Sequence, residues 1–194
     1  MSEIEIRNLI IESATKYFSK YGFHKTTMDE IARNIHKAKG ALYYYFKSKE
    51  ELFNEVLKKE LGNVKKELTE ITGSDKDPIT QLKKYFITRF KLLSTAVNYH
   101  ETLKADFFEK YDFVKDVRED FAEFEYKQLR YILEKGKKEG YLEIKDVESN
   151  VNMATMLFNN IEIPLFLQNK YTEYEKVIEE LVSMILNSLK SHKK

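Results

Sequence analysis

The chain of 194 residues contains no cysteine and no tryptophan, and only two prolines and six glycines. Without cysteine it can form neither a disulfide nor a thiolate metal site. Few helix breakers, combined with many lysines, glutamates, leucines and isoleucines, favour an almost wholly helical chain. We therefore predict an all-α fold of about nine helices.

Long apolar segments and a strong net charge are absent as well. No run is long enough to span a bilayer, and the N-terminus lacks the apolar block of a signal peptide. We therefore expect a cytoplasmic protein with no membrane partner. The formal net charge is only +1, so any attraction to nucleic acid must come from a local patch.

Signatures of catalysis are also missing. The four histidines are scattered without metal-ligand spacing, and there is no HExxH sequence, glycine-rich phosphate loop or nucleophile elbow. The many acidic residues fit the solvated sides of helices. We predict that the protein is not an enzyme and uses no metal or cofactor.

The stretch from Thr27 to Phe46 has the pattern of two short helices joined by a tight turn. Thr27 and Glu30 are spaced as a capping box. The turn covers residues 36–38, and the second helix runs from Lys39 to about Tyr45. The pattern predicts a helix-turn-helix, whose second helix enters the major groove of DNA. Apolar residues at helical spacing form its buried side: Met28, Ile31, Ala32, Ile35, Leu42 and Phe46.

The outward side of the second helix suits DNA. Gly40 and Ala41 let the helix approach base edges closely, Lys39 can reach a phosphate or a guanine, and tyrosine hydroxyls can bond phosphates. A helical corner with a solvated basic face fits the same spacing and charge. The charged residues from 33 to 49 are all basic: Arg33, Lys37, Lys39, Lys47 and Lys49.

More specific motifs surround this stretch: Tyr17-Phe18, Gly22-Phe23, Thr26-Thr27, Ile31-Ala32, residues 39–44, Phe46 and residues 47–52. On these motifs, about the first quarter of the chain resembles the N-terminal domain of the TetR/AcrR family of bacterial transcriptional regulators. The resemblance implies a helix-turn-helix domain at residues 1–48 and an effector-binding and dimerisation domain at residues 49–194. With the basic run, it gives these DNA-binding residues: Thr27, Lys37, Lys39, Gly40, Ala41, Tyr43, Tyr44, Tyr45 and Lys49.

Three positions depart from the family pattern. His36 stands in the turn where glycine is usual, although a side chain tolerates positive φ less well. Ala38 replaces the common serine, which removes a helix cap worth roughly 0.5–2 kcal/mol. Tyr45 stands where histidine is common. These changes affect the turn, the cap and the phosphate contacts rather than the side that faces the bases.

The rest of the chain predicts further helices from apolar spacing and from caps. Gly22 should end the first helix, and Pro164 should kink the eighth. The expected spans are Glu3–Tyr21, a long helix opened by Ser48 and Glu51, a helix from Pro78, a short one around Leu103–Tyr111, Phe113–Lys138, one opened by Asp146 or Ser149, and a last one opened by Thr172 and Glu175.

Phenylalanine and tyrosine concentrate between Tyr85 and Tyr131. Any one of them fits simple core packing, but together they are predicted to line an apolar pocket. The family resemblance implies a small inducer in this region, and an aromatic lining suits an acyl chain or a hydrophobic drug-like molecule. The candidate lining residues are Phe86, Arg89, Phe90, His100, Phe107, Phe108, Tyr111, Tyr126, Phe158, Asn159 and Asn160.

The last two helices are predicted to form the dimer interface, as the resemblance implies, although they could instead close the core of one subunit. A dimer is expected because one recognition helix reads too few base pairs, whereas paired half-sites form a palindromic operator. The candidate interface residues are Ala154, Phe158, Ile178, Val182, Ile185 and Leu189.

These observations together predict a sequence-specific transcriptional regulator, a repressor released by a small apolar effector. Two other functions fit the sequence. One is a DNA-binding organiser or adaptor that acts through a protein partner without a small-molecule effector. The other is a helical binding protein that has lost its affinity for DNA.

Overall fold

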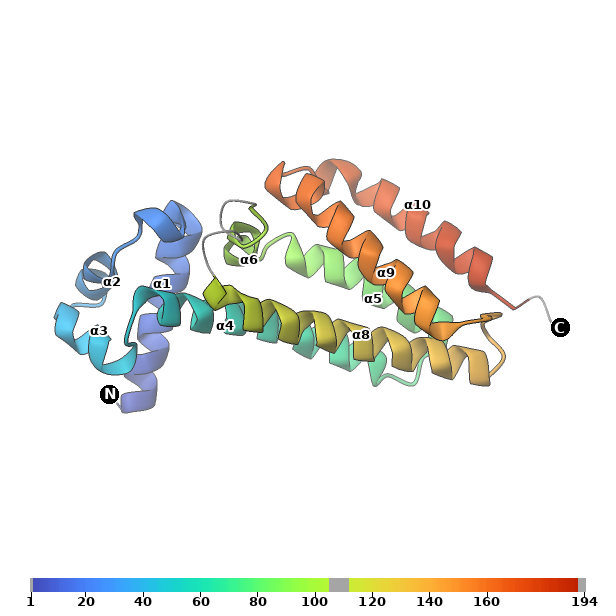
Figure 1. The fold of residues 1–194 in the computed structure, drawn as a ribbon, viewed down its shortest axis with the longest axis horizontal. Coiled ribbons are helices and arrows are strands. Elements are labelled where there is room, and N and C mark those ends of the chain that lie inside the picture. Colours follow the sequence, from blue (N-terminus) through green and yellow to red (C-terminus); the bar gives the residue numbers. More distant parts are fainter. Residues whose placement is uncertain (1, 105–111, 192–194) are drawn as a thin grey trace. The chain divides into compact units, whose positions relative to one another are not determined.

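The computed structural model describes residues 2–104 and 112–191. In these ranges the chain forms nine α-helices and no strand, which confirms the predicted all-α class. Figure 1 shows the helices in chain order. Their bounds are α1 Glu3–Lys25, α2 Met28–Asn34, α3 Lys39–Tyr45, α4 Lys49–Thr72, α5 Pro78–Leu93, α6 Val97–Glu101, α8 Lys115–Lys138, α9 Val147–Glu162 and α10 Tyr171–Leu189, with a 3-10 turn at Asp112–Val114 and a π turn at Ile163–Leu167.

The chain divides into two compact units. The N-terminal unit comprises Met1–Gly62 and Ala96–Val117, and the C-terminal unit comprises Asn63–Thr95 and Arg118–Lys194. The long helices α4 and α8 therefore contribute to both units. The domain division after residue 48 stays a prediction.

An aromatic cluster forms much of the core of the N-terminal unit. The ring of Phe53 lies 5.0 Å from those of both Phe18 and Phe23, and Phe113 lies 5.3 Å from Phe23. Gly22, at φ 79° and ψ 164°, breaks the helical path of α1 before Phe23. This break is where the sequence predicts the end of the first helix, and it turns Phe23 into the core.

Helix α6 has its N-terminal cap supplied by another helix. Ala96, at its N-cap position, has no side-chain acceptor. Instead, the carboxylate of Glu60 on α4 accepts bonds from the backbone N–H of Asn98 (3.3 Å), the backbone N–H of Tyr99 (2.9 Å) and the Asn98 side-chain amide (2.9 Å). Asn98 also donates to Ser19 on α1 at 2.9 Å, so α6 is fixed to two helices of its unit.

In the C-terminal unit, α9 and α10 lie side by side and α10 packs on α5 (Figure 1). The segment after α10 returns to the loop that follows α8. The Glu143 N–H donates to the Leu189 carbonyl at 2.9 Å, and the Ser191 N–H donates to the Tyr141 carbonyl at 3.0 Å. No helix in the described part of the chain is long and apolar enough to cross a membrane.

One expected helix start needs correction. The last helix begins at Tyr171 after Lys170, with no side-chain cap, so the proposed capping box of Thr172 and Glu175 is wrong. The chain turns earlier because Asn169, at φ 54°, follows the π turn that contains Pro164. Helix α6 is an element that the sequence did not predict, and the short helix expected around Leu103–Tyr111, with Phe107, Phe108 and Tyr111, falls largely outside the described residues.

Candidate DNA-binding interface

Helix α2 starts with the predicted capping box. The Glu30 N–H donates to the Thr27 hydroxyl at 3.3 Å, and the Thr27 N–H donates to the Glu30 carboxylate at 2.9 Å. The Thr27 hydroxyl also donates to that carboxylate at 2.7 Å. These bonds from Thr27 lower the pKa of Glu30. The start of α2 is therefore fixed, while the Thr27 side chain stays exposed at the surface.

The turn between α2 and α3 adopts the conformation that usually requires glycine. His36 has φ 54°, in the left-handed region that side chains rarely adopt. The N–H groups of His36 and Lys37 donate back to the carbonyls of Arg33 (3.1 Å) and Ala32 (3.0 Å). Ala38, at the N-cap of α3, makes no side-chain cap bond. The turn thus forms despite both departures, without the help of glycine or a cap.

Helix α3 divides into a buried and an open side. Leu42 and Phe46 are fully buried, as is Ile31 of α2. On the other side, Tyr43 is 44% exposed and Tyr44 is 74% exposed. Nothing lies within 4 Å of the position that a Cβ atom would take on Gly40. The open side therefore presents a cation, a stretch of backbone without side chains and two phenol groups, and it is accessible to a partner as large as DNA.

Tyr44 has a partner that the sequence did not reveal. Its hydroxyl donates to the carboxylate of Glu3, at the start of α1, at 3.1 Å, and this bond raises the pKa of Tyr44. Its ring also meets that of Tyr45 edge-on, with centroids 5.1 Å apart. Tyr45 is half-buried. The contact to Glu3 spans 41 positions in the sequence, so no local pattern predicts it.

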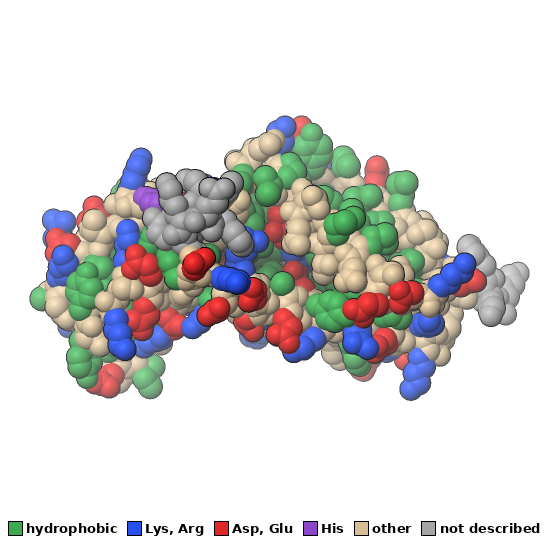
Figure 2. All heavy atoms as spheres, viewed as in Figure 1, with side chains coloured by type: hydrophobic (Ala, Val, Ile, Leu, Met, Phe, Trp, Pro, Cys, Tyr) green, Lys and Arg blue, Asp and Glu red, His purple; other side chains and the backbone are tan. Residues whose placement is uncertain are grey.

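The proposed basic contacts fall into two groups. Lys37 and Lys39 are exposed. Lys49 is half-buried, and its ammonium donates to the backbone carbonyls of Phe23 (2.8 Å) and Thr26 (3.1 Å). Over the N-terminal unit, the face drawn in Figure 2 carries acidic and basic side chains intermixed. In the sequence, the run of residues 33–49 contains basic residues and no acidic one.

Residues 10–56, which contain α2, the turn, α3 and Lys49, match the model of the family described as bacterial regulatory proteins, tetR family. These residues are a TetR-type DNA-binding segment. The chain is 42% identical over 67 residues to the regulator YhgD of Bacillus subtilis, a match that spans 34% of the chain and 35% of YhgD. It is 27% identical over 192 residues to the transcriptional regulator QacR of Staphylococcus aureus, spanning 96% of the chain and 99% of QacR.

A solved structure extends the likeness over nearly the full chain. It is the Clostridium perfringens putative fatty acid metabolism regulator, which is 29% identical, has a TM-score of 0.69, and matches over 93% of this chain and 98% of its own. The chain is accordingly a DNA-binding transcriptional regulator.

The C-terminal unit encloses a cluster of charged side chains. Arg89 is 1% exposed and donates through Nη2 to Glu125 at 2.9 Å and to Glu162 at 2.5 Å, with a further bond from Nε to Glu125. Its guanidinium lies 3.9 Å from the ring centroid of Phe158. Burial raises the pKa of Glu125. Arg89 is thus engaged by two carboxylates rather than presented to a pocket.

Of the other predicted pocket residues, three phenylalanines lie together in the core of the C-terminal unit. Phe86 and Phe90 are buried and pack on Phe158, with centroids 5.0 and 5.6 Å away. Tyr126 bonds Glu148 on the surface of the unit. The remaining candidates lie elsewhere: Asn159 and Asn160 are exposed, His100 belongs to the N-terminal unit, and Phe107, Phe108 and Tyr111 lie outside the described residues.

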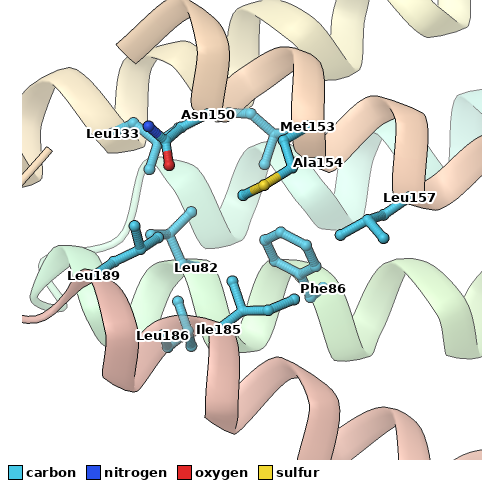
Figure 3. Close-up of a pocket in the computed structure, with 11 residues that line it drawn as sticks. Leu82, Phe86, Leu133, Asn150, Met153, Ala154, Leu157, Ile185, Leu186 and Leu189 are labelled. Atoms are coloured by element: carbon cyan, nitrogen blue, oxygen red, sulfur yellow. The ribbon is translucent and has the colours of Figure 1, made fainter. Parts of the chain in front are cut away.

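A small apolar cavity does lie among α5, α8, α9 and α10 (Figure 3). Its volume of about 20 Å³ suffices for roughly one water molecule. Among the residues that the structure describes, Phe86 is the only predicted lining residue that borders it, and Asn150 supplies the only polar side chain. An acyl chain or a drug-sized molecule therefore needs this core to open.

The predicted interface residues lie mostly inside the subunit. Ala154, Phe158, Ile178 and Val182 are at most 7% exposed. Ile185 and Leu189 are half-buried. The spacing identified the inner faces of α9 and α10 and missed an outer apolar set. That set includes Met153, Met156, Ile163, Val177, Leu181 and Met184, which are 36% to 70% exposed.

Proposed function

We propose that this regulator is a homodimeric repressor that binds a palindromic operator and releases it when a small, largely apolar effector binds. The observation that carries this proposal is the open side of α3, where Lys39, Gly40, Tyr43 and Tyr44 lie outside the core. A side chain of the core must pack, whereas these residues face solvent on the helix that such a motif places in the major groove.

The residues on the open side have different proposed roles in DNA binding. Lys39 is the group that reads a guanine edge or pairs with a phosphate, and the bare surface at Gly40 and Ala41 allows close approach to base edges. Tyr43 and Tyr44 bond phosphates and hold the helix in register. Thr27, Lys37 and Tyr45 supply further phosphate contacts beside the groove. Sequence specificity thus rests chiefly on the first turn of α3.

The outer faces of α9 and α10 are the proposed dimer interface. They expose Met156, Val177 and Met184 by more than half. Beside them lies an apolar groove of about 250 Å³, bordered by Pro164, Leu165, Tyr174, Val177 and Leu181. Large apolar patches of this kind mark protein contacts, and a two-fold axis through the patch would bury it against its own copy.

The effector is proposed to enter the apolar core of the C-terminal unit. The name of the Clostridium perfringens relative links that protein to fatty acid metabolism, which supports an acyl chain as the first class to test here. The cavity of about 20 Å³ fits the state without effector. A ligand that binds only an opened core would shift the population toward that state, and so away from the operator-binding one.

Selection of bound fragments from a random DNA pool, at moderate and stated salt, tests the proposal. The expected result is a palindromic motif with two half-sites about one helical turn apart or more. Enrichment that vanishes when Lys39→Ala and Tyr44→Ala are combined would tie the motif to α3. Salt-sensitive binding to all fragments without a motif would contradict a sequence-specific repressor and favour a DNA organiser.

Sedimentation tests the interface separately. Val177→Glu and Met184→Glu, placed on the exposed faces of α10, should convert the dimer to a monomer and weaken binding to the palindrome. Tyr131→Glu, at an exposed aromatic of α8, is the matched control and should stay dimeric. Dimers of wild-type strength from both α10 variants would place the interface elsewhere.

A further inference from the structure

The half-buried ammonium of Lys49 occupies an unusual position beside the helix-turn-helix. Lys49 is the first residue of α4, whose start is fixed by a bond from the Glu51 N–H to the Ser48 hydroxyl at 3.1 Å. Its ammonium lies 2.8 Å from the Phe23 carbonyl, 3.1 Å from the Thr26 carbonyl and 4.2 Å from the ring centroid of Phe23. One cation thus caps two carbonyls at the end of α1 and covers an aromatic face.

These carbonyls need such a partner. The break at Gly22 disrupts the regular bonding of α1, and the last carbonyls of a helix have no acceptor role within it. A cation near the C-terminal end of a helix is favourable, and an ammonium over an aromatic face adds a further attraction. Phe23 is itself only 2% exposed, so the ammonium packs on a rigid part of the core.

The junction held by Lys49 leads directly into α2. Thr26 is followed by Thr27, which caps α2 through its reciprocal bonds with Glu30. The Thr26 hydroxyl donates to the Gly22 carbonyl at 2.8 Å, which ties the same junction from the other side. A displacement of the Thr26 carbonyl would therefore move the cap of α2, and with it the helix-turn-helix.

An ammonium has three donor hydrogens. In Lys49 two are directed at carbonyls, and desolvation by burial lowers the pKa of this group. Exposed lysines such as Lys37 and Lys39 retain their hydration and can reach a phosphate freely. The geometry therefore separates Lys49 from the other cations of the basic run.

We infer that Lys49 is a positioning residue, which clamps the junction of α1 and α2 and so sets the helix-turn-helix for operator binding, instead of serving mainly as a phosphate contact. This inference rests on the proposed operator-binding function. Lys49 then acts through its bonds to the Phe23 and Thr26 carbonyls, within the protein, and not through DNA. Removal of its ammonium should weaken operator binding without removing one phosphate contact.

The salt dependence of operator affinity tests this role. Each lost phosphate contact lowers the slope of log K against log salt by about 0.9. Lys49→Met keeps the apolar stem and should lower affinity roughly tenfold or more with the slope unchanged. Lys37→Met, at an exposed lysine of the same run, is the control and should lower the slope by about 0.9.

Arginine substitution gives an independent measurement. Lys49→Arg preserves the charge, so a phosphate contact would be largely restored. The planar guanidinium cannot place a compact cation between the two carbonyls and the Phe23 ring, so we expect Lys49→Arg to bind as weakly as Lys49→Met. Hydrogen exchange should quicken at the amides of residues 27–33 in both variants and stay unchanged at residues 52–57, which a general loss of stability would also affect.

The outcomes separate the inference from the proposed function. A wild-type protein that selects no operator would refute the proposed function and the inference with it. A wild-type protein that binds its operator, with a slope about 0.9 lower in Lys49→Met and full recovery in Lys49→Arg, would refute the inference alone. Should Lys49→Met fail to fold, the affinity and slope of Lys49→Arg decide the matter.

Discussion

The two units of the molecule use their distinctive side chains in opposite ways. In the N-terminal unit, the core of the helix-turn-helix is complete without Lys39, Tyr43 and Tyr44, which stay on the surface. In the C-terminal unit, the arginine and the phenylalanine that the sequence suggested as ligand contacts are packed in the core. Arg89 is enclosed by two carboxylates, and Phe158 lies at the centre of an aromatic cluster.

This difference shows when residue type is informative. A short helix with a fixed buried side has few positions left, so whatever occupies the open side is available for binding. A large helical core has many positions for aromatics, and nothing local distinguishes a lining residue from a packed one. An unused residue on a small element is therefore stronger evidence of function than a notable residue in a large core.

Removal of the buried cation of the C-terminal unit should have the largest effect on stability. Arg89→Met should destabilise the protein by about 3–5 kcal/mol, because it leaves two buried carboxylates without their partner. Thermal or urea unfolding measures this. Adding Glu125→Gln and Glu162→Gln should restore much of the loss, and Lys91→Met, at an exposed position of α5, should change little. A mild Arg89→Met variant with altered effector response would make Arg89 a ligand group after all.

Substitutions on the open side of α3 should have the opposite signature. Lys39→Ala and Tyr44→Ala should each weaken operator binding by about 1–3 kcal/mol while the unfolding free energy stays near that of wild type. Titration of a labelled operator together with urea unfolding checks both parts. Lys16→Ala, at an exposed lysine of α1, is the control. Loss of stability without loss of affinity would return these residues to a structural role.

A smaller effect concerns pH. Burial raises the pKa of Glu125 in the folded state, so the stability that this group contributes is fully present below its unfolded pKa. It is lost as pH rises through the raised folded pKa. Compared with Glu125→Gln, the wild type should therefore lose unfolding free energy as pH rises from the ordinary glutamate range. Parallel stability curves for the two proteins from acid to neutral pH would show that Glu125 carries no such linkage.

The smallest expected change is a gain. Ala38→Ser supplies the missing acceptor at the N-cap of α3 and should stabilise the protein by roughly 0.5–2 kcal/mol. Ala38→Val adds bulk without an acceptor and is the control. Equal unfolding free energies for Ala38→Ser and wild type would show that the backbone of this turn already satisfies the start of α3.

Much of the fold follows from local rules. The capping box of Thr27, the break at Gly22 and the start of α5 at Pro78 are each set by neighbouring residues, so the sequence predicts them. Contacts between residues that are far apart in the sequence cannot be predicted from such local rules. Lys49 meets Phe23 at a separation of 26 residues, and Arg89 meets Glu162 at a separation of 73. The capping box of Thr172 and Glu175 was wrong because the preceding π turn decides where α10 begins.

Helix α6 draws its cap from a different helix, through three bonds to Glu60, and this makes its folding conditional. A helix of five residues is too short to be stable alone, because nucleation costs more than so few bonds return. Its helical state therefore depends on the carboxylate of α4 being in reach. If α4 moved so far that its hydrogen bonds to α6 broke, α6 would unfold locally and lose its bond to α1, rather than move as a rigid body.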